Sequence, residues 1–170
     1  MGNDQSVTTQ KLQFNTSFRH NDTRMDMSMV VNNNNVQAMA SNGMCTTCIV
    51  GHTTQDGKTF HISSFSKTGK KCTGIGLKLL CWMLDKVVAT QVVDVTLDVN
   101  GEIHMLEKTK IARSDKTGAQ KKLKAKTVAE RLANYYQHRY GFKRVDTSES
   151  LHISMKTTAN ELRARCASQH

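Results

Sequence analysis

The stretch that decides the fold is Ser66-Lys67-Thr68-Gly69-Lys70-Lys71-Cys72-Thr73-Gly74-Ile75-Gly76-Leu77-Lys78-Leu79-Leu80. It joins a segment of β-strand character to a segment of helical spacing through glycines and lysines. Glycines let the backbone approach a ligand closely, and the N–H groups of such a loop and of the first helical turn point at an anion. The stretch therefore predicts a phosphate-binding loop. A tight strand-to-helix turn that needs glycine only for its geometry is the alternative interpretation.

Spacing excludes two common phosphate-binding motifs. No Gly-Lys-Ser/Thr follows at the distance that a Walker loop requires, and the third glycine of the dinucleotide fingerprint is absent. An anion site of another class and a tight turn without a ligand remain the two interpretations of the loop.

The segments on either side of the loop predict a strand before it and a helix after it. Residues 45–53 are rich in β-branched side chains, Asp56-Gly57 is typical of a tight hairpin turn, and residues 58–66 form the returning strand. We expect Phe60, Ile62 and Ser64 on one face of that strand. Residues 77–89 have apolar side chains at helical spacing, and the Val-rich residues 92–99 predict a further strand.

The remaining elements complete the order strands, helix, strand, helix, strands. Leu12, Phe14 and Phe18 predict a short edge strand, and Thr127-Val128-Ala129-Glu130 has the form of a capping box that starts a helix ending at Gly141. Other segments predict strands or a helix by their alternation or spacing: strands at 25–31, 36–40, 142–146 and 151–156, a turn at 32–35, and a short helix at 159–167. The order predicts an α+β fold in a single domain, with a mixed, mostly antiparallel sheet flanked by helices.

Two motifs carry a resemblance to a known family. Lys71-x-x-Gly74-Ile75-Gly76 resembles the pyrophosphate motif Arg/Gln-x-x-Gly-x-Gly/Ala of the GNAT N-acetyltransferases, with lysine in the first position. The run from Tyr135-Tyr136 to Gly141-Phe142 is similar to the helix-to-strand signature of that family. The resemblance covers residues 45–156. We expect three parts along the chain: a polar N-terminal segment at 1–22, a GNAT-like acyl-CoA-binding domain at 23–156 with a basic insertion at 101–126, and a C-terminal helix and tail at 157–170.

The resemblance also implies site residues and acetyl-CoA as the acyl donor. Tyr136 matches the general acid that protonates the departing CoA thiolate; a core aromatic residue is the alternative interpretation. The strand before the loop lacks the glutamate base of the family, so His61, Asp98 and Glu102 are the candidates for the general base, and a structural role is the alternative for His61. The residues implied to bind the cofactor are Ser66, Lys71, Cys72, Thr73, Gly74, Ile75, Gly76 and Leu77.

The charge of the chain favours an acidic partner. The formal net charge is +10, and residues 101–126 hold eight Lys or Arg against three Asp or Glu. We expect this segment, from Lys108 to Lys126, to contact a nucleic acid or another acidic partner. Lysines that only keep a loop solvated are the alternative.

The expected function is therefore an N-acyltransferase that moves an acetyl group from acetyl-CoA to an amine of an unidentified acceptor. The alternatives are a catalytically inactive GNAT-like structural or nucleic-acid-binding protein that uses the basic insertion, and a nucleic-acid-binding module unrelated to CoA. We expect no metal, because Cys45-x-x-Cys48 with His52 lacks the partner pair of a structural zinc site. The odd count of five cysteines predicts reduced thiols, and with no apolar stretch of membrane-spanning length we expect a cytoplasmic protein without membrane contact.

Overall fold

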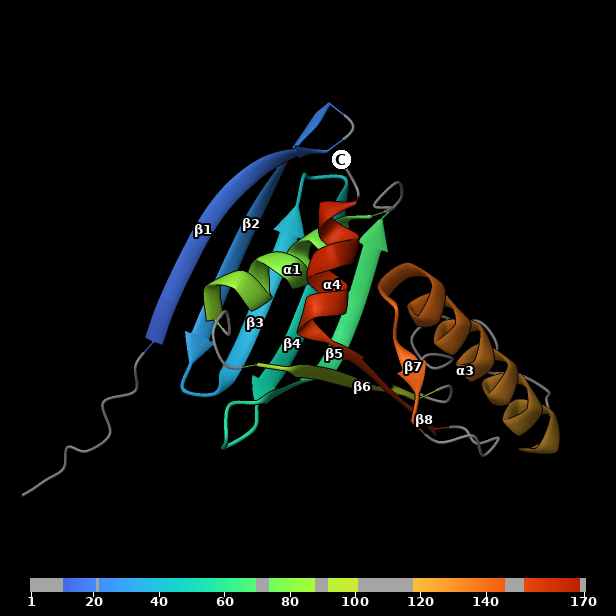
Figure 1. Ribbon diagram of the computed structural model, residues 1–170. Helices are drawn as coiled ribbons and strands as arrows, with labels where there is room; N and C mark the ends of the chain where they lie inside the picture. Colours follow the sequence, from blue (N-terminus) through green and yellow to red (C-terminus); the bar gives the residue numbers. More distant parts are fainter. Residues whose placement is uncertain are drawn as a thin grey trace, which may run out of the picture. The chain divides into compact units, whose positions relative to one another are not determined.

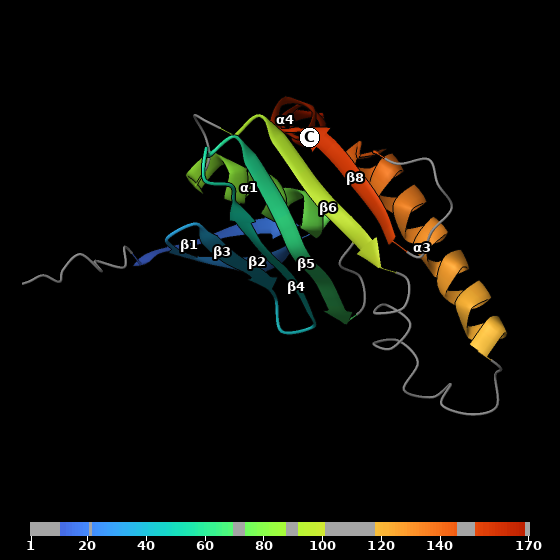
Figure 2. The same ribbon diagram turned by 90° about the horizontal axis from the view of Figure 1, so that it is seen from below.

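The chain is α+β, and its strand pairing is mostly antiparallel, as expected (Figures 1 and 2). The structure is a computed structural model, and it describes residues 11–20, 22–69, 74–87, 92–100, 118–145 and 152–168. The chain divides into two compact units, unit 1 (Met1–Val93) and unit 2 (Asp94–His170).

Unit 1 is an antiparallel meander followed by one helix. Its five strands pair in chain order, each with the next (Figure 1). The elements are β1 (Lys11–His20), β2 (Thr23–Asn32), β3 (Asn35–Ser41), β4 (Cys45–Thr53), β5 (Thr59–Gly69) and α1 (Ile75–Val87). Every strand and the helix that the sequence predicts here is present, although β1 is longer than a short edge strand.

Three turns between these strands, those at 32–35 and Asp56-Gly57 predicted from the sequence, rest on residues with left-handed backbone. Asn33 joins β2 to β3 with φ of 57°, and Gly43 and Gly57 have φ of 84° and 73°. The side chain of Asn42 accepts from the N–H groups of residues 44 and 45, at 2.8 and 2.9 Å. Asn and Gly tolerate positive φ, and an Asn side chain can imitate a backbone turn, so these turns follow from local chemistry.

One face of the meander is apolar and is covered by α1 (Figures 1 and 2). Inward-facing residues alternate along the strands, as the two-residue period of a β-strand requires. Methionines and small aliphatic side chains supply most of this layer because the chain has few aromatic residues. The buried members include Met25, Met29, Ala38, Ala40, Ile49, Leu79, Leu80, Met83 and Leu84.

A β-bulge interrupts the pairing of β4 with β5. Val50 lies opposite Ser64 and Gly51 lies opposite Ile62, so Ser63 has no pairing partner on β4. The extra residue reverses the alternation of β5, and Phe65 lies opposite the buried Ile49 on the core face. The prediction that Ser64 shares a face with Phe60 and Ile62 is therefore wrong.

Unit 2 is a three-stranded antiparallel sheet with two helices. Its strand order is β6-β8-β7, α3 packs against β6 and β8, and α4 packs against β8 (Figure 2). The elements are β6 (Asp94–Asn100), α3 (Gly118–Tyr140), β7 (Lys143–Arg144), β8 (His152–Thr158) and α4 (Ala159–Ala167). The buried core includes Val95, Leu97, Phe142, Ile153, Met155 and Leu162.

The predicted capping box is wrong, and the sequence holds a second copy of the same pattern that does cap a helix. Thr127 lies inside α3, because the preceding segment is rich in Ala, Lys, Gln and Leu, which favour helix. Glu130 instead accepts two hydrogen bonds from Arg144, at 2.7 and 3.1 Å. The functioning cap is Thr158 before α4, whose hydroxyl accepts from the N–H of Glu161 at 3.1 Å.

The helix end at Gly141 is confirmed. Gly141 has φ of 82°, and its N–H donates to the carbonyl of Gln137 at 3.1 Å. The N–H of Phe142 donates to the carbonyl of Tyr136 at 3.3 Å. These bonds satisfy the last carbonyls of α3 and turn the chain into β7.

The expectation that all cysteines are reduced is wrong for three of them. Cys45, Cys81 and Cys166 are disulfide-bonded, whereas Cys48 is a free thiol on β4. Burial raises the pKa of the Cys48 thiol. The number of cysteines alone does not show which of them form disulfides, so the sequence did not predict this mixture.

Candidate functional site

The described part of the predicted phosphate loop is its helical end. Lys71, Cys72 and Thr73 lie outside the described residues. Gly74 has φ of 86°, and α1 begins at the next residue, Ile75. The carbonyl of Gly74 accepts from the N–H of Lys78 at 3.4 Å, which closes the first helical turn.

Buried side chains anchor this first turn in the core of unit 1. Ile75 and Leu77 are 1% and 3% exposed, so their side chains point into the core of unit 1. The first N–H groups of an α-helix have no partner within the helix, and the helix dipole adds positive potential there. Gly76, between the two anchors, adds no side chain. The arrangement is chemically suited to an anion such as a diphosphate.

Two residues of β1 lie beside this helix start, and sequence reasoning missed both. A Cβ on Gly74 would lie 3.4 Å from the Cε1 atom of His20. The ammonium of Lys78 lies 5.1 Å from the ring centroid of Phe18 and makes a cation–π contact. The β1–β2 hairpin brings these residues to α1 through sheet pairing, so no local sequence signal marks them.

The candidates on β5 lie on the face of the sheet opposite α1. Ser66 lies opposite Cys48, and His61 lies opposite His52, with 5.4 Å between the two imidazole centroids. Neither position belongs to the buried alternation that faces α1. The structure thus brings Ser66 and His61 to one face of the strand, and Gly74, Ile75, Gly76 and Leu77 to the other side of the sheet.

Tyr136 lies in an aromatic cluster in unit 2. Its ring centroid is 5.7 Å from that of Tyr140 and 6.1 Å from that of Phe142, and its side chain is 9% exposed. Burial raises the pKa of the Tyr136 phenol, so the hydroxyl keeps its proton throughout the neutral range. A protonated phenol suits a general acid, and the same burial suits a core aromatic residue.

Asp98 is held by a neighbouring strand. It lies on β6 opposite Ser154 of β8, whose hydroxyl donates to its carboxylate at 2.8 Å. The side chain is exposed, so a proton acceptor at this position is accessible from solvent. Glu102, the other acidic candidate, lies outside the described residues.

Unit 2 also contains a cavity of about 400 Å³ beside Gly141. Lys143 and Lys156, which line it, lie directly opposite each other in the β7–β8 ladder. Lys156 also lies 3.5 Å from a carboxylate oxygen of Asp94. Two lysines at one cross-strand position concentrate positive charge at this wall of the cavity.

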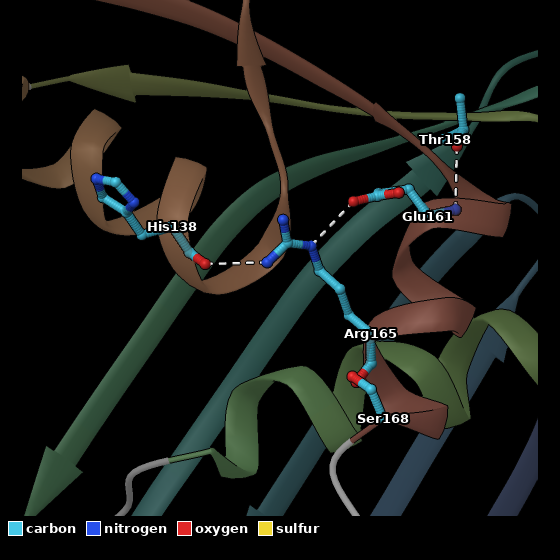
Figure 3. A network of polar contacts seen from close by, with 5 residues as sticks. All are labelled: His138, Thr158, Glu161, Arg165 and Ser168. Atoms are coloured by element: carbon cyan, nitrogen blue, oxygen red, sulfur yellow. Dashed lines mark hydrogen bonds and ion pairs between the residues drawn. The ribbon is translucent and has the colours of Figure 1, made fainter.

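Thr158 and Glu161, which also line the cavity, belong to a polar network (Figure 3). Arg165 donates to the carbonyl of His138 at 3.0 Å and to the carboxylate of Glu161 at 3.1 Å. Glu161 is also the residue whose N–H is capped by Thr158. The network ties α4 to the last turn of α3.

The predicted basic insertion is divided between described and undescribed residues. Residues 101–117 lie outside the described part of the chain, and residues 118–126 form the first turns of α3. Among the described residues, no three His, Cys, Asp or Glu side chains are grouped as metal ligands, and no helix is long and apolar enough to cross a membrane.

The comparisons with known proteins give no family for this chain. No known family model matches the chain, and no curated protein matches it significantly. The fold and the residues thus define only a general class: an α+β protein in which a left-handed glycine precedes a helix whose first turn is suited to an anion.

Proposed function

We propose that the chain is an N-acyltransferase that transfers an acetyl group from acetyl-CoA to an amine. The observation that carries this proposal is the left-handed Gly74 directly before α1, where first-turn amides and buried anchors at Ile75 and Leu77 suit a diphosphate. The order of elements from β4 to β8 is the order that the GNAT resemblance implies. The motif in the sequence and the geometry of the helix start support the proposal at the same residues, Gly74 to Leu77.

The proposed reaction is direct attack. The amine nitrogen attacks the acetyl carbonyl carbon, and negative charge develops on the carbonyl oxygen. Backbone amides of β5 near its bulge are the candidates to polarise that oxygen. The C–S bond then breaks, the thiolate of CoA takes up a proton, and a base accepts the proton that the amine loses. The GNAT resemblance implies Tyr136 as the acid and His61 or Asp98 as the base.

Binding is tested by thermal unfolding with acetyl-CoA, CoA and inorganic pyrophosphate. A ligand bound only by the folded state raises the melting temperature, and at a hundred times its Kd it stabilises by about 2.7 kcal/mol. Gly74→Ala should weaken acetyl-CoA binding about tenfold, because left-handed backbone is strained with a side chain. Gly43→Ala is the matched control: φ at Gly43 is 84°, and no atom lies within 4 Å of the added carbon.

Transfer is tested by release of the free CoA thiol in the presence of a panel of amines. Amine-dependent release supports the acyltransferase, whereas binding without release supports a scaffold that has lost catalysis. No thermal shift with saturating acetyl-CoA, or equal affinity in the Gly74→Ala variant, would contradict the proposal.

A second candidate is an inactive GNAT-like protein that binds nucleic acid through its basic segment. The observation that favours it is the early start of α3, which makes residues 118–126 helical and so places four lysines of the basic segment on one element. Changing four lysines of this segment to glutamine, at 121, 122, 124 and 126, should weaken nucleic-acid binding and flatten its dependence on salt. Binding that is unaltered by these changes would remove the segment as the contact surface.

A further inference from the structure

Strand β1 is a long edge with little of the usual protection. It pairs with β2 over ten successive residues without a register shift, and among the described strands it ends the sheet order. Edges of natural sheets are commonly protected by lysines and other charged side chains, bulges or prolines, and of these β1 carries only Lys11 and Arg19, near its two ends. β1 has no bulge against β2, the chain has no proline, and its inward-facing side chains include Leu12, Phe14 and Phe18. Leu12 is 52% exposed.

We propose that β1 pairs antiparallel with β1 of a second copy of this chain, about a two-fold axis at Thr16. Paired residues must share a face, because a shift of one residue would place core-facing side chains against outward-facing ones. This condition leaves only registers centred on a residue. A self-complementary strand also closes a two-fold dimer, since each contact occurs twice.

The Thr16-centred register gives complementary pairs on both faces. On the core face, Phe14 lies opposite Phe18 of the second copy, twice, and Thr16 lies opposite its own copy. On the outer face, Gln13 lies opposite Arg19 of the second copy. Aromatic pairs and Thr–Thr pairs are favourable across strands, and this register sets no like charges opposite each other.

The neighbouring registers lose this complementarity. Centring on Asn15 places Lys11 opposite Arg19 of the second copy, two like charges. Centring on Ser17 places Phe14 opposite His20 and Phe18 opposite Thr16, which removes the Phe–Phe pair. Charge and ring complementarity therefore select the register at Thr16.

The dimer is tested on the full chain by light scattering across concentration and salt. Both copies carry a formal charge of +10, so added salt should strengthen the association, the opposite of its effect on nucleic-acid binding. Thr16→Lys places two ammonium groups face to face and should weaken the dimer about tenfold or more. Thr16 is exposed, so the monomer tolerates this change.

A cysteine cross-link tests the register itself. In a Cys48→Ser background, Thr16→Cys should give a covalent dimer in a mildly oxidising buffer, because the two copies of this residue meet at the axis. Gln13→Cys is the matched control: the position is also exposed, but its two copies lie about 20 Å apart along the paired strands. A monomeric mass at every concentration, a dimer that is indifferent to Thr16→Lys, or equal cross-linking of both cysteine variants would overturn the proposal.

Discussion

Gly141→Ala should destabilise unit 2 by more than its backbone conformation alone explains. Gly141 has φ of 82°, and holding a non-glycine residue in left-handed backbone costs roughly 1–2 kcal/mol. A Cβ there would also lie 2.6 Å from Nε of Arg165 and 3.0 Å from the carboxylate of Glu161. The added methyl group therefore displaces the Arg165 side chain from the network of Figure 3.

The loss of that network adds to the cost of the backbone strain. Arg165 would lose its bond to the carbonyl of His138 and its pairing with Glu161, whose side chain is 48% exposed. Exposed ion pairs contribute less than about 1 kcal/mol, and the bond to the carbonyl contributes roughly 1 kcal/mol. We therefore expect a total of about 2–4 kcal/mol for Gly141→Ala, against about 1–2 kcal/mol for Gly43→Ala, which meets no atom.

Urea unfolding measures both variants. The three tyrosines of the chain all lie in unit 2, whereas its single tryptophan, Trp82, lies in unit 1, so tyrosine and tryptophan signals report on the units separately. In an Arg165→Ala background, Gly141→Ala should cost only the backbone share, about 1–2 kcal/mol. An equal cost in both backgrounds would refute the reasoning that the methyl group acts through Arg165.

Three further predictions follow from single contacts. The Arg144 hydrogen bonds lower the pKa of Glu130. The stabilisation that they give is therefore present above the unfolded pKa of 4.5 and is lost as the pH falls through the lower pKa of the folded state. In urea unfolding, Glu130→Gln should cost about 0.5 kcal/mol at neutral pH and nothing in strong acid. Tyr136→Phe should reduce amine-dependent turnover roughly a hundredfold while acetyl-CoA affinity stays the same, and unchanged turnover would assign Tyr136 to the core alone. Under denaturing, non-reducing conditions iodoacetamide should modify Cys48 and leave the three disulfide-bonded cysteines unmodified; mass spectrometry that finds those three alkylated before reduction would contradict their oxidised state.

Local chemistry made most of the fold predictable. The Asp56-Gly57 turn and the alternation on both sides of it gave β4 with both ends correct and β5 with small end errors. The left-handed Gly141 and the helix after Thr158 were likewise marked by their own residues. In each case the pattern and the structure depend on contacts between residues close in the chain.

The errors arose where one local pattern has two outcomes. Thr127-x-x-Glu130 and Thr158-x-x-Glu161 are the same motif, and only the second follows a strand; the first follows strong helix formers, which carry the helix through it. The bulge at Ser63 left no composition signal, since serine is ordinary on an exposed strand. In both cases the neighbouring segments determine the local structure, and the motif itself does not.

The candidate site was predictable only in its local part. Gly74 and the start of α1 lie where the motif places them, because glycine punctuation is a local signal. His20 reaches Gly74 only through the pairing of β1 with β2, and the sequence assigned most of that strand to a separate polar segment. His61 and α1 lie on opposite faces of the sheet because of the pairing register of the whole meander, and no short motif encodes that register.

The bulge at Ser63 also determines where β5 can change in length. Deleting this residue would restore a regular ladder: Ile62 would still lie opposite Gly51, Ser64 opposite Val50 and Phe65 opposite Ile49. A deletion at another position in the paired strand would exchange inward and outward side chains on one side of the gap. Ser63 is thus the position in β5 where one residue can be deleted while the same side chains stay in the core of unit 1.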